Sequence, residues 1–188
     1  MMKPSRWLIA ALIALLLPGC SAVKVSQDYD PATDFSEYRT FAWYPGPQPK
    51  TGDIRVDNPL LDERIREAVT RELISKGFRR VAGETPDFYV AYHLTIRTKL
   101  EADTVHTGIG YGRYPYYGGV GYDTWVRQYD EGMLVIDIAD AEAEKLIWRG
   151  VGTRRVTETK NPQKSTQVVN QTVAEILAQF PPHKTNTD

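Results

Sequence analysis

The alternation of apolar and polar residues over 87–100 constrains the fold of this chain more than any other feature of its sequence. One face of this segment carries the apolar side chains Phe88, Val90, Tyr92, Leu94 and Ile96. Such alternation is typical of a strand in an antiparallel sheet, with one face against a core and the other toward water. Residues 124–139 and 146–156 indicate two further strands, joined by a hairpin loop at 140–144. The pattern therefore predicts a mainly antiparallel sheet.

Shorter segments complete the predicted sheet. Residues 23–25, 40–44 and 78–81 are short strand candidates, and the proline-rich stretch 45–57 is expected to be an exposed loop. Gly132 predicts a β-bulge at Glu131–Gly132, because a glycine inside a strand often marks one.

Two amphipathic helices are predicted, each opened by an Asn-Pro pair. Asn58 and Asn161 suit the N-cap, and the following proline suits the first helical position because its missing N–H would have no partner there. The first helix ends at Lys76–Gly77, as a glycine C-cap does, and the second spans about 164–179. Their apolar stripes are Leu61, Ile65, Ala68, Val69 and Leu73 in the first, and Val169, Val173, Ile176, Leu177 and Phe180 in the second. The order β-β-α-β-β-β-β-α predicts an α+β two-layer sandwich, with both helices on one face of the sheet.

The first twenty residues predict export and a membrane anchor. Lys3 and Arg6 precede an apolar run over 7–17, which is shorter than the roughly 20 residues that span a membrane. The following Leu-Pro-Gly-Cys at 17–20 resembles the lipobox of bacterial lipoprotein signals. That resemblance implies cleavage before Cys20, a diacylglycerol on its sulfur and an acylated amine. Cys20 is the only cysteine in the chain, so no disulfide competes for its sulfur.

The chain is therefore expected to consist of a signal peptide (1–19), a lipidated N-terminus (20–22), a single α+β domain (23–182) and a disordered tail (183–188). Without Lys3 and Arg6, 21 Lys and Arg stand against 24 Asp and Glu, a formal charge of −3. Because the two signs are interspersed, the sequence gives no basic patch for nucleic acid.

The sequence contains no recognisable catalytic, metal or cofactor motif. None of its three histidines stands at metal-ligand spacing from another histidine or from the cysteine, and there is no Gly-x-Ser-x-Gly elbow. Three aspartates near the start, Asp28, Asp30 and Asp34, fit turn and cap roles better than a calcium loop. Asp137, charged within an apolar strand, is either a general acid or base or, as we prefer, the partner of Arg149 across the hairpin.

Residues 107–123 alternate glycine with tyrosine. A dinucleotide-binding loop is excluded because Pro115 replaces the last glycine of the motif and no helix follows. The segment is expected to be a long loop between two strands, either a flexible hairpin tip or a contact surface for a protein or glycan, since tyrosine offers flat apolar area with a polar tip. The candidate contact residues are Tyr111, Tyr114, Tyr116, Tyr117, Tyr122 and Trp125.

The segments placed above resemble the bacterial lipoproteins that carry the domain of unknown function 4136. The resemblance covers roughly residues 23–182 and rests on DYD at 28–30, FSEYRTFAW at 35–43, NPLLD at 58–62, GF at 77–78, DFYVAY at 87–92, GMLVIDIAD at 132–140, LIWRG at 146–150 and FPP at 180–182. It implies the fold, lipidation and an envelope location, and no catalytic residues. Because Ser21 follows Cys20, similarity to enteric lipoproteins implies the outer membrane, with the domain in the periplasm.

Three functions follow as hypotheses. The first is a lipid-anchored, non-catalytic module without a cofactor that binds an envelope protein or glycan through the Gly/Tyr loop. The second is a structural subunit of an envelope complex. The third is a hydrolase of envelope polymers that acts through carboxylates such as Asp87 and Asp137.

Overall fold

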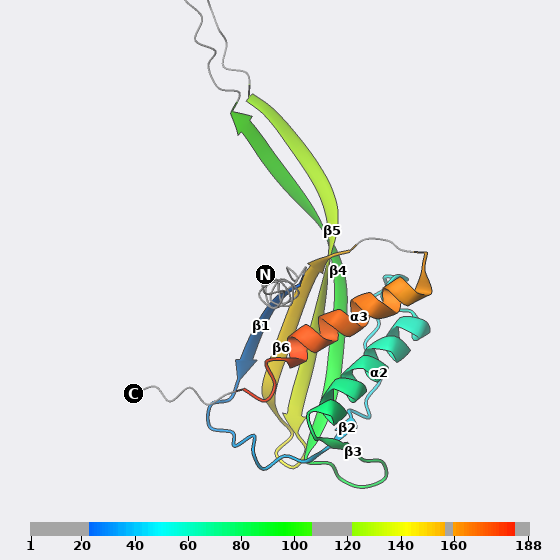
Figure 1. The fold of residues 1–188 in the computed structure, drawn as a ribbon, viewed down its shortest axis with the longest axis vertical. Coiled ribbons are helices and arrows are strands. Elements are labelled where there is room, and N and C mark those ends of the chain that lie inside the picture. Colours follow the sequence, from blue (N-terminus) through cyan, green and yellow to red (C-terminus); the bar gives the residue numbers. More distant parts are fainter. Residues whose placement is uncertain (1–22, 107–121, 157–159, 183–188) are drawn as a thin grey trace, which may run out of the picture.

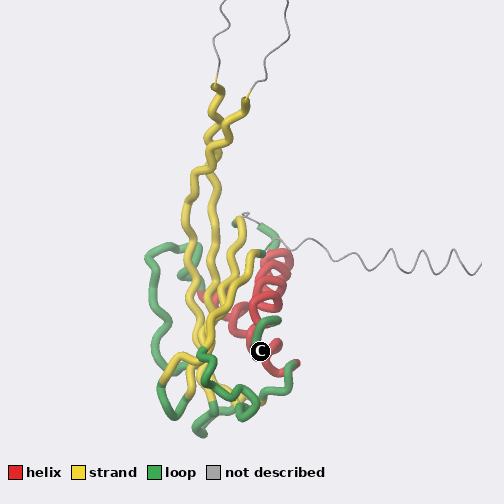
Figure 2. Tube along the Cα trace, turned by 90° about the vertical axis from the view of Figure 1, so that its left-hand side faces the viewer, coloured by secondary structure: helices red, strands yellow, loops and turns green. Residues whose placement is uncertain are grey.

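The computed structural model describes residues 23–106, 122–156 and 160–182, and these form an α+β two-layer sandwich (Figure 1). The predicted fold class is confirmed: two helices cover one face of a six-stranded, mainly antiparallel sheet (Figure 2). The predicted signal peptide, lipidated residues and tail lie outside the described residues. No helix in the described ranges has the length and apolar character needed to cross a membrane.

The sheet has the strand order β1-β6-β5-β4-β2-β3. Its strands are β1 (Lys24–Tyr29), β2 (Thr40–Trp43), β3 (Arg79–Arg80), β4 (Phe88–His106), β5 (Tyr122–Asp140) and β6 (Lys145–Arg155). The pairs β1–β6, β6–β5 and β5–β4 are antiparallel, whereas β2 runs parallel to both β4 and β3. The β2–β3 pair is parallel because helix α2 connects these two strands as a crossover.

Both helices begin at their predicted Asn-Pro pairs, and the second covers 162–177 rather than about 164–179. Helix α2 (Pro59–Ser75) begins after Asn58, whose side chain accepts a hydrogen bond from the Leu60 N–H. Helix α3 (Pro162–Leu177) begins after Asn161, whose side chain accepts from two backbone N–H groups of the first turn. Gly77, with φ of +93°, ends the C-terminal turn of α2 in the left-handed conformation that favours glycine.

The core lies between the helices and the sheet and is rich in aromatic rings. Four large aromatic side chains are fully buried there: Phe41, Phe88, Trp148 and Phe180. Helix α3 passes close to β6, because a Cβ on Gly150 would lie only 2.6 Å from Ile176 Cγ2 and 2.2 Å from Trp148 Cη2. Glycine on this strand therefore lets the helix approach and leaves space for the indole ring.

The bulge predicted at Glu131–Gly132 is wrong. Both residues pair in unbroken register with β4, and the register shift lies instead between Ile138 and Ala139, on the β6 side. Gly132 has a packing role, since a Cβ there would lie 3.0 Å from Val156 Cγ2.

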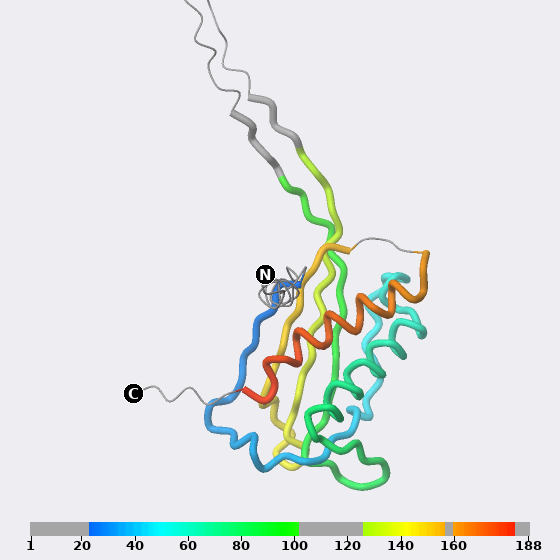
Figure 3. Tube along the Cα trace, viewed as in Figure 1, coloured from blue at the N-terminus to red at the C-terminus, as the bar shows by residue number. Residues whose placement is uncertain are grey.

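Strands β4 and β5 are longer than predicted and leave the sheet together. Strand β6 pairs with β5 only as far as Glu131, and β2 pairs with β4 only at the opposite end of that strand. Beyond Glu131 and its partner Arg97, β4 and β5 pair only with each other among the described strands. They project from the sandwich as a two-stranded ribbon, here called the β4–β5 hairpin (Figures 1 and 3).

Candidate functional site

The base of the β4–β5 hairpin is held by charged contacts to the body of the domain. Asp130 accepts a hydrogen bond from Thr98 Oγ1 at 2.7 Å and pairs with Arg55 Nη1 at 2.6 Å. On the other side, Arg155 of β6 pairs with Glu101 at 2.5 Å, and its guanidinium lies 4.1 Å from the centre of the Tyr129 ring. A single exposed ion pair contributes little to the free energy of folding. Here such contacts are made on both faces of the hairpin, and they join it to the sandwich.

One face of the hairpin carries exposed apolar side chains. Leu100 is 72% exposed and Val126 is 61% exposed. Leu100 pairs with Gln128 and Val126 with Ala102, so the two side chains are diagonal neighbours on the same face. This face continues the helix-covered face of the sheet beyond the helices, where nothing in the described structure covers it.

The predicted contact residues belong to the β4–β5 hairpin and to the Gly/Tyr-rich segment between its two strands. Tyr111, Tyr114, Tyr116 and Tyr117 lie outside the described residues. Tyr122 was expected in the loop, but it is the first residue of β5, opposite His106. Trp125 is also in β5, opposite Asp103. The Gly/Tyr-rich segment therefore joins the far ends of the two projecting strands.

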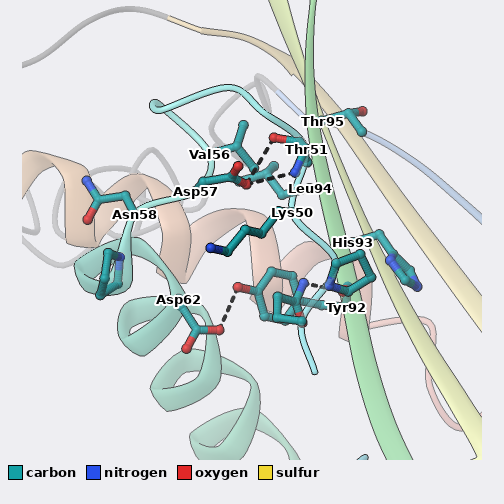
Figure 4. Close-up of a pocket in the computed structure, with 13 residues that line it drawn as sticks. Lys50, Thr51, Val56, Asp57, Asn58, Asp62, Tyr92, His93, Leu94 and Thr95 are labelled. Carbon is teal, nitrogen blue, oxygen red and sulfur yellow. Dashed lines mark hydrogen bonds between the residues drawn. The ribbon is translucent and has the colours of Figure 1, made fainter. Parts of the chain in front are cut away.

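A pocket of about 370 Å³ lies at the edge of β4, beyond the end of β2 (Figure 4). The loop before α2 covers this edge, and Gln48 Nε2 donates to the Tyr92 carbonyl at 2.9 Å. Tyr92 Oη donates a hydrogen bond to Asp62 Oδ1 at 2.7 Å. The pKa of Tyr92 is raised, mainly because the side chain is buried and secondly because of this hydrogen bond. Arg66 also donates to Asp62, at 2.9 Å. Gln48, Asp62 and Tyr92 thus fix the loop and helix to the strand, whereas the buried Thr95 Oγ1 of the same pocket has no hydrogen-bond partner among the described residues.

Asp57 plays a similar structural role at the mouth of the same pocket. It accepts hydrogen bonds from the Thr51 N–H and hydroxyl and from the Gly52 N–H. The backbone N–H of Thr51 contributes most to lowering the pKa of Asp57. The side chain of Lys50 extends into the pocket (Figure 4). Because Asp57 stays ionised, it is unsuited to act as a general acid at neutral pH.

The two carboxylates of the hydrolase hypothesis, Asp87 and Asp137, lie apart, and each accepts hydrogen bonds from other groups of the domain. Asp87 accepts from the backbone N–H groups of Arg39 and Thr40 at 2.8 and 2.7 Å. Asp137 is bound by Arg149 through two bonds of 2.7 and 2.8 Å, which confirms the predicted cross-hairpin pair. Asp137 lies opposite Ala91, four residues along β4 from Asp87, a separation of about 13 Å along the strand. Glycosidase carboxyl pairs lie closer, at about 5–9.5 Å.

The carboxyl groups with a shifted pKa all ionise more readily than an ordinary carboxyl group. Every carboxyl group with a resolved shift has a lowered pKa: Asp30, Asp53, Asp57, Asp87, Asp130 and Asp140. The described residues contain no group of three or more His, Cys, Asp or Glu side chains that could hold a metal ion. Asp30 and Asp34 accept hydrogen bonds from backbone N–H groups two residues later, which confirms their predicted turn roles.

Asp140 is expected to make the stability of the domain depend on pH. Its carboxylate accepts from the Ala143 N–H at 2.6 Å and from Tyr38 Oη at 2.6 Å, and the Ala143 bond contributes most to its lowered pKa. A lowered folded-state pKa gives stability that is complete above the unfolded value of about 3.9 and is lost as pH falls through the folded value. Asp140→Asn is therefore expected to be less stable at pH 7 and to lose less stability between about pH 4 and 2.

Urea unfolding at a series of pH values measures this effect, with the exposed Glu142→Gln as the control. An acid slope in Asp140→Asn equal to that of the unmodified chain would show that Asp140 does not contribute.

The chain matches a known family model and is similar in fold to solved structures. A family model described as "Domain of unknown function (DUF4136)" matches residues 25–182. No curated protein matches the chain. The chain is similar to a PDZ domain protein from Parabacteroides distasonis, with 14% identity and a TM-score of 0.52 over 87% of this chain. It spans only 36% of that protein's length, and at this identity the likeness shows the fold alone.

Two structures of the PelC dodecamer from Paraburkholderia phytofirmans are also similar. One, a point variant, has 12% identity, a TM-score of 0.47 and coverage of 83% of this chain and 95% of that chain. The other has 13% identity, a TM-score of 0.44 and coverage of 83% and 96%.

Proposed function

The chain belongs to the DUF4136 family, and we propose that it is a lipid-anchored envelope module that binds a partner through the β4–β5 hairpin and catalyses no reaction. The partner is an envelope protein or glycan. The anchor is the acylated Cys20, and the proposed location is the outer membrane with the domain in the periplasm.

The projecting hairpin is the observation that carries this proposal. Its strands leave the sandwich together, and the Gly/Tyr-rich segment joins their far ends. The exposed Leu100 and Val126 lie on one face of the same hairpin. A surface that combines tyrosines with exposed apolar side chains suits contact with a partner, because each ring contributes a large area at a low entropic cost.

The state of the carboxyl groups supports a non-catalytic role. A hydrolase of the proposed kind needs one carboxyl with a raised pKa as the acid and a second nearby as the base or nucleophile. Asp87 and Asp137 are each bound by hydrogen-bond donors of the fold, and Asp137 lies opposite Ala91, four residues along the chain from Asp87.

The position of the first described strand supports a short anchor. Val23 is only 6% exposed, and β1 begins with the next residue. Three residues extended between Cys20 and Val23 span at most about 11 Å. An acylated Cys20 would therefore hold the domain against the membrane surface.

Metabolic labelling with an alkyne analogue of palmitate tests the anchor. The full chain is expected to carry the label and to sediment with the outer membrane, because two or more acyl chains anchor a protein stably. The matched control is Cys20→Ser, which keeps the approximate size of the side chain but has a hydroxyl in place of the thiol and cannot form the thioether. Labelling that persists in Cys20→Ser, or an unlabelled full chain, would contradict the proposed anchor.

A further inference from the structure

A second cavity, of about 400 Å³, lies between the two helices and the sheet at the end of the sandwich where the hairpin begins. Apolar side chains from both layers line it, including Leu94 and Leu134 from the sheet and Val168 from α3. Gly132 and Gly152 line the cavity from adjacent strands, and a Cβ on Gly152 would lie only 2.7 Å from Ile176, so α3 packs closely on β6 beside the cavity. The volume lies within the range of small-molecule sites, about 300–1,000 Å³.

Cationic side chains line the same cavity. Arg154 donates to the Val168 carbonyl at 3.4 Å and to Thr172 Oγ1 at 3.2 Å, and Lys160 precedes the N-cap of α3. Within the described ranges, no carboxylate lies within ion-pair distance of either group. A third cation, Arg55, is already paired with Asp53 and Asp130. The cavity therefore combines an apolar interior with two positive charges that lack an acidic partner in the described structure.

The position of the cavity brings it near the proposed membrane anchor. Lys24, at the start of β1, pairs with Thr153, the neighbour of Arg154. Figure 1 shows the start of β1, the end of β6 and the beginnings of both helices at the end of the sandwich from which the hairpin leaves. With an acylated Cys20, this end of the domain would lie next to the lipid surface.

We propose that this cavity binds an anionic membrane lipid, with an acyl chain among the apolar side chains and the phosphate at Arg154 and Lys160. The membrane-facing orientation rests on the proposed anchor, whereas the apolar lining and the two cations do not. The positive charges favour an anionic lipid over the chain's own thioether-linked diacylglycerol, which carries no charge at its head.

Photo-crosslinking in vesicles tests this inference on the purified full chain. The vesicles contain phosphatidylcholine with a small fraction of a diazirine-bearing lipid, either phosphatidylglycerol or phosphatidylcholine with the same acyl chain. Mass spectrometry of the peptides locates each adduct. Adducts are expected on peptides that line the cavity, with the anionic probe favoured about fivefold over the zwitterionic one, as one cation near an anionic lipid provides.

Two variants of α3 and its cap localise the signal. Ser165 lines the cavity, so Ser165→Trp is expected to block labelling, while Gln167→Trp adds the same ring on the exposed part of the helix and keeps it. Lys160→Glu, at an exposed position outside the core, is expected to remove the preference for the anionic probe and serves if Ser165→Trp does not fold.

Equal labelling by both probes, adducts confined to other peptides, or labelling unchanged in Ser165→Trp and Lys160→Glu would overturn the proposal. Labelling of the cavity peptides that appears only in Cys20→Ser, which lacks the chain's own acyl groups, would also overturn it, because the occupant of the unmodified chain would then be its own anchor. The readout is independent of palmitate labelling at Cys20. A chain without acyl groups that still binds the anionic probe would refute the anchor and leave the cavity assignment intact.

Discussion

Replacing Trp148 with alanine is expected to reduce the free energy of unfolding by about 3–5 kcal/mol, the usual cost of truncating a buried aromatic side chain. Trp148 is fully buried in β6, and its ring centre lies 5.1 Å from that of Phe180. Its Nε1 also donates to Gln27 Oε1 at 2.9 Å, across to the edge strand β1. Truncation would empty the space beside Gly150 and leave Gln27 without this donor. Typical domains have only about 5–15 kcal/mol of stability, so the variant would be close to unfolding.

Urea unfolding followed by tryptophan fluorescence and far-UV circular dichroism measures this loss. Tyr44→Ala is the matched control, because Tyr44 is an aromatic residue that is 58% exposed and makes an edge contact with Tyr89. Tyr44→Ala should reduce the free energy of unfolding far less than Trp148→Ala does. A loss below about 1 kcal/mol in Trp148→Ala would show that the core is not organised around this ring.

The helices and the faces of the central strands could be predicted from the sequence because their signals are local. Asn58 and Asn161 cap the helices as expected, and the apolar stripe of each helix faces the core. The Asp137–Arg149 pair was also predictable, since a short hairpin loop fixes which residues face each other. In each case a few neighbouring residues determine the geometry.

The sheet order and the hairpin could not be predicted, because they depend on contacts between distant residues. Strands β2 and β3 have four and two residues, too few for an alternation that would specify their partners. Beyond Ile96 the apolar face of β4 is interrupted by Thr98, and Leu100 on the same face is exposed. The ribbon is instead supported by cross-strand polar contacts, such as the 2.5 Å pair between Lys99 and Glu131, which a search for apolar periodicity does not detect.

The two pockets could not be predicted from the sequence either. The loop over 45–57 was expected to be simply exposed, yet Gln48 attaches it to the edge of β4. The cavity near Arg154 is lined by residues from both helices and three strands, and its two cations come from different segments, Arg154 from β6 and Lys160 from the residues before α3. Such an arrangement cannot be recognised from the spacing of histidines, from glycine motifs or from runs of charge. The signal that could have indicated it is the pair of glycines, Gly132 and Gly152, on the helix-facing side of adjacent strands.

Photo-crosslinking in cells tests the central claim, that the β4–β5 hairpin carries the contact surface. A photoreactive amino acid replaces Tyr116 in the Gly/Tyr-rich segment or the exposed Leu100 on the hairpin. The matched control position is Ile74 on α2, which is 52% exposed. One dominant protein or glycan adduct is expected from the two hairpin positions and none from Ile74. A folded, membrane-anchored chain without an adduct at either hairpin position, or with the same adduct from Ile74, would contradict it.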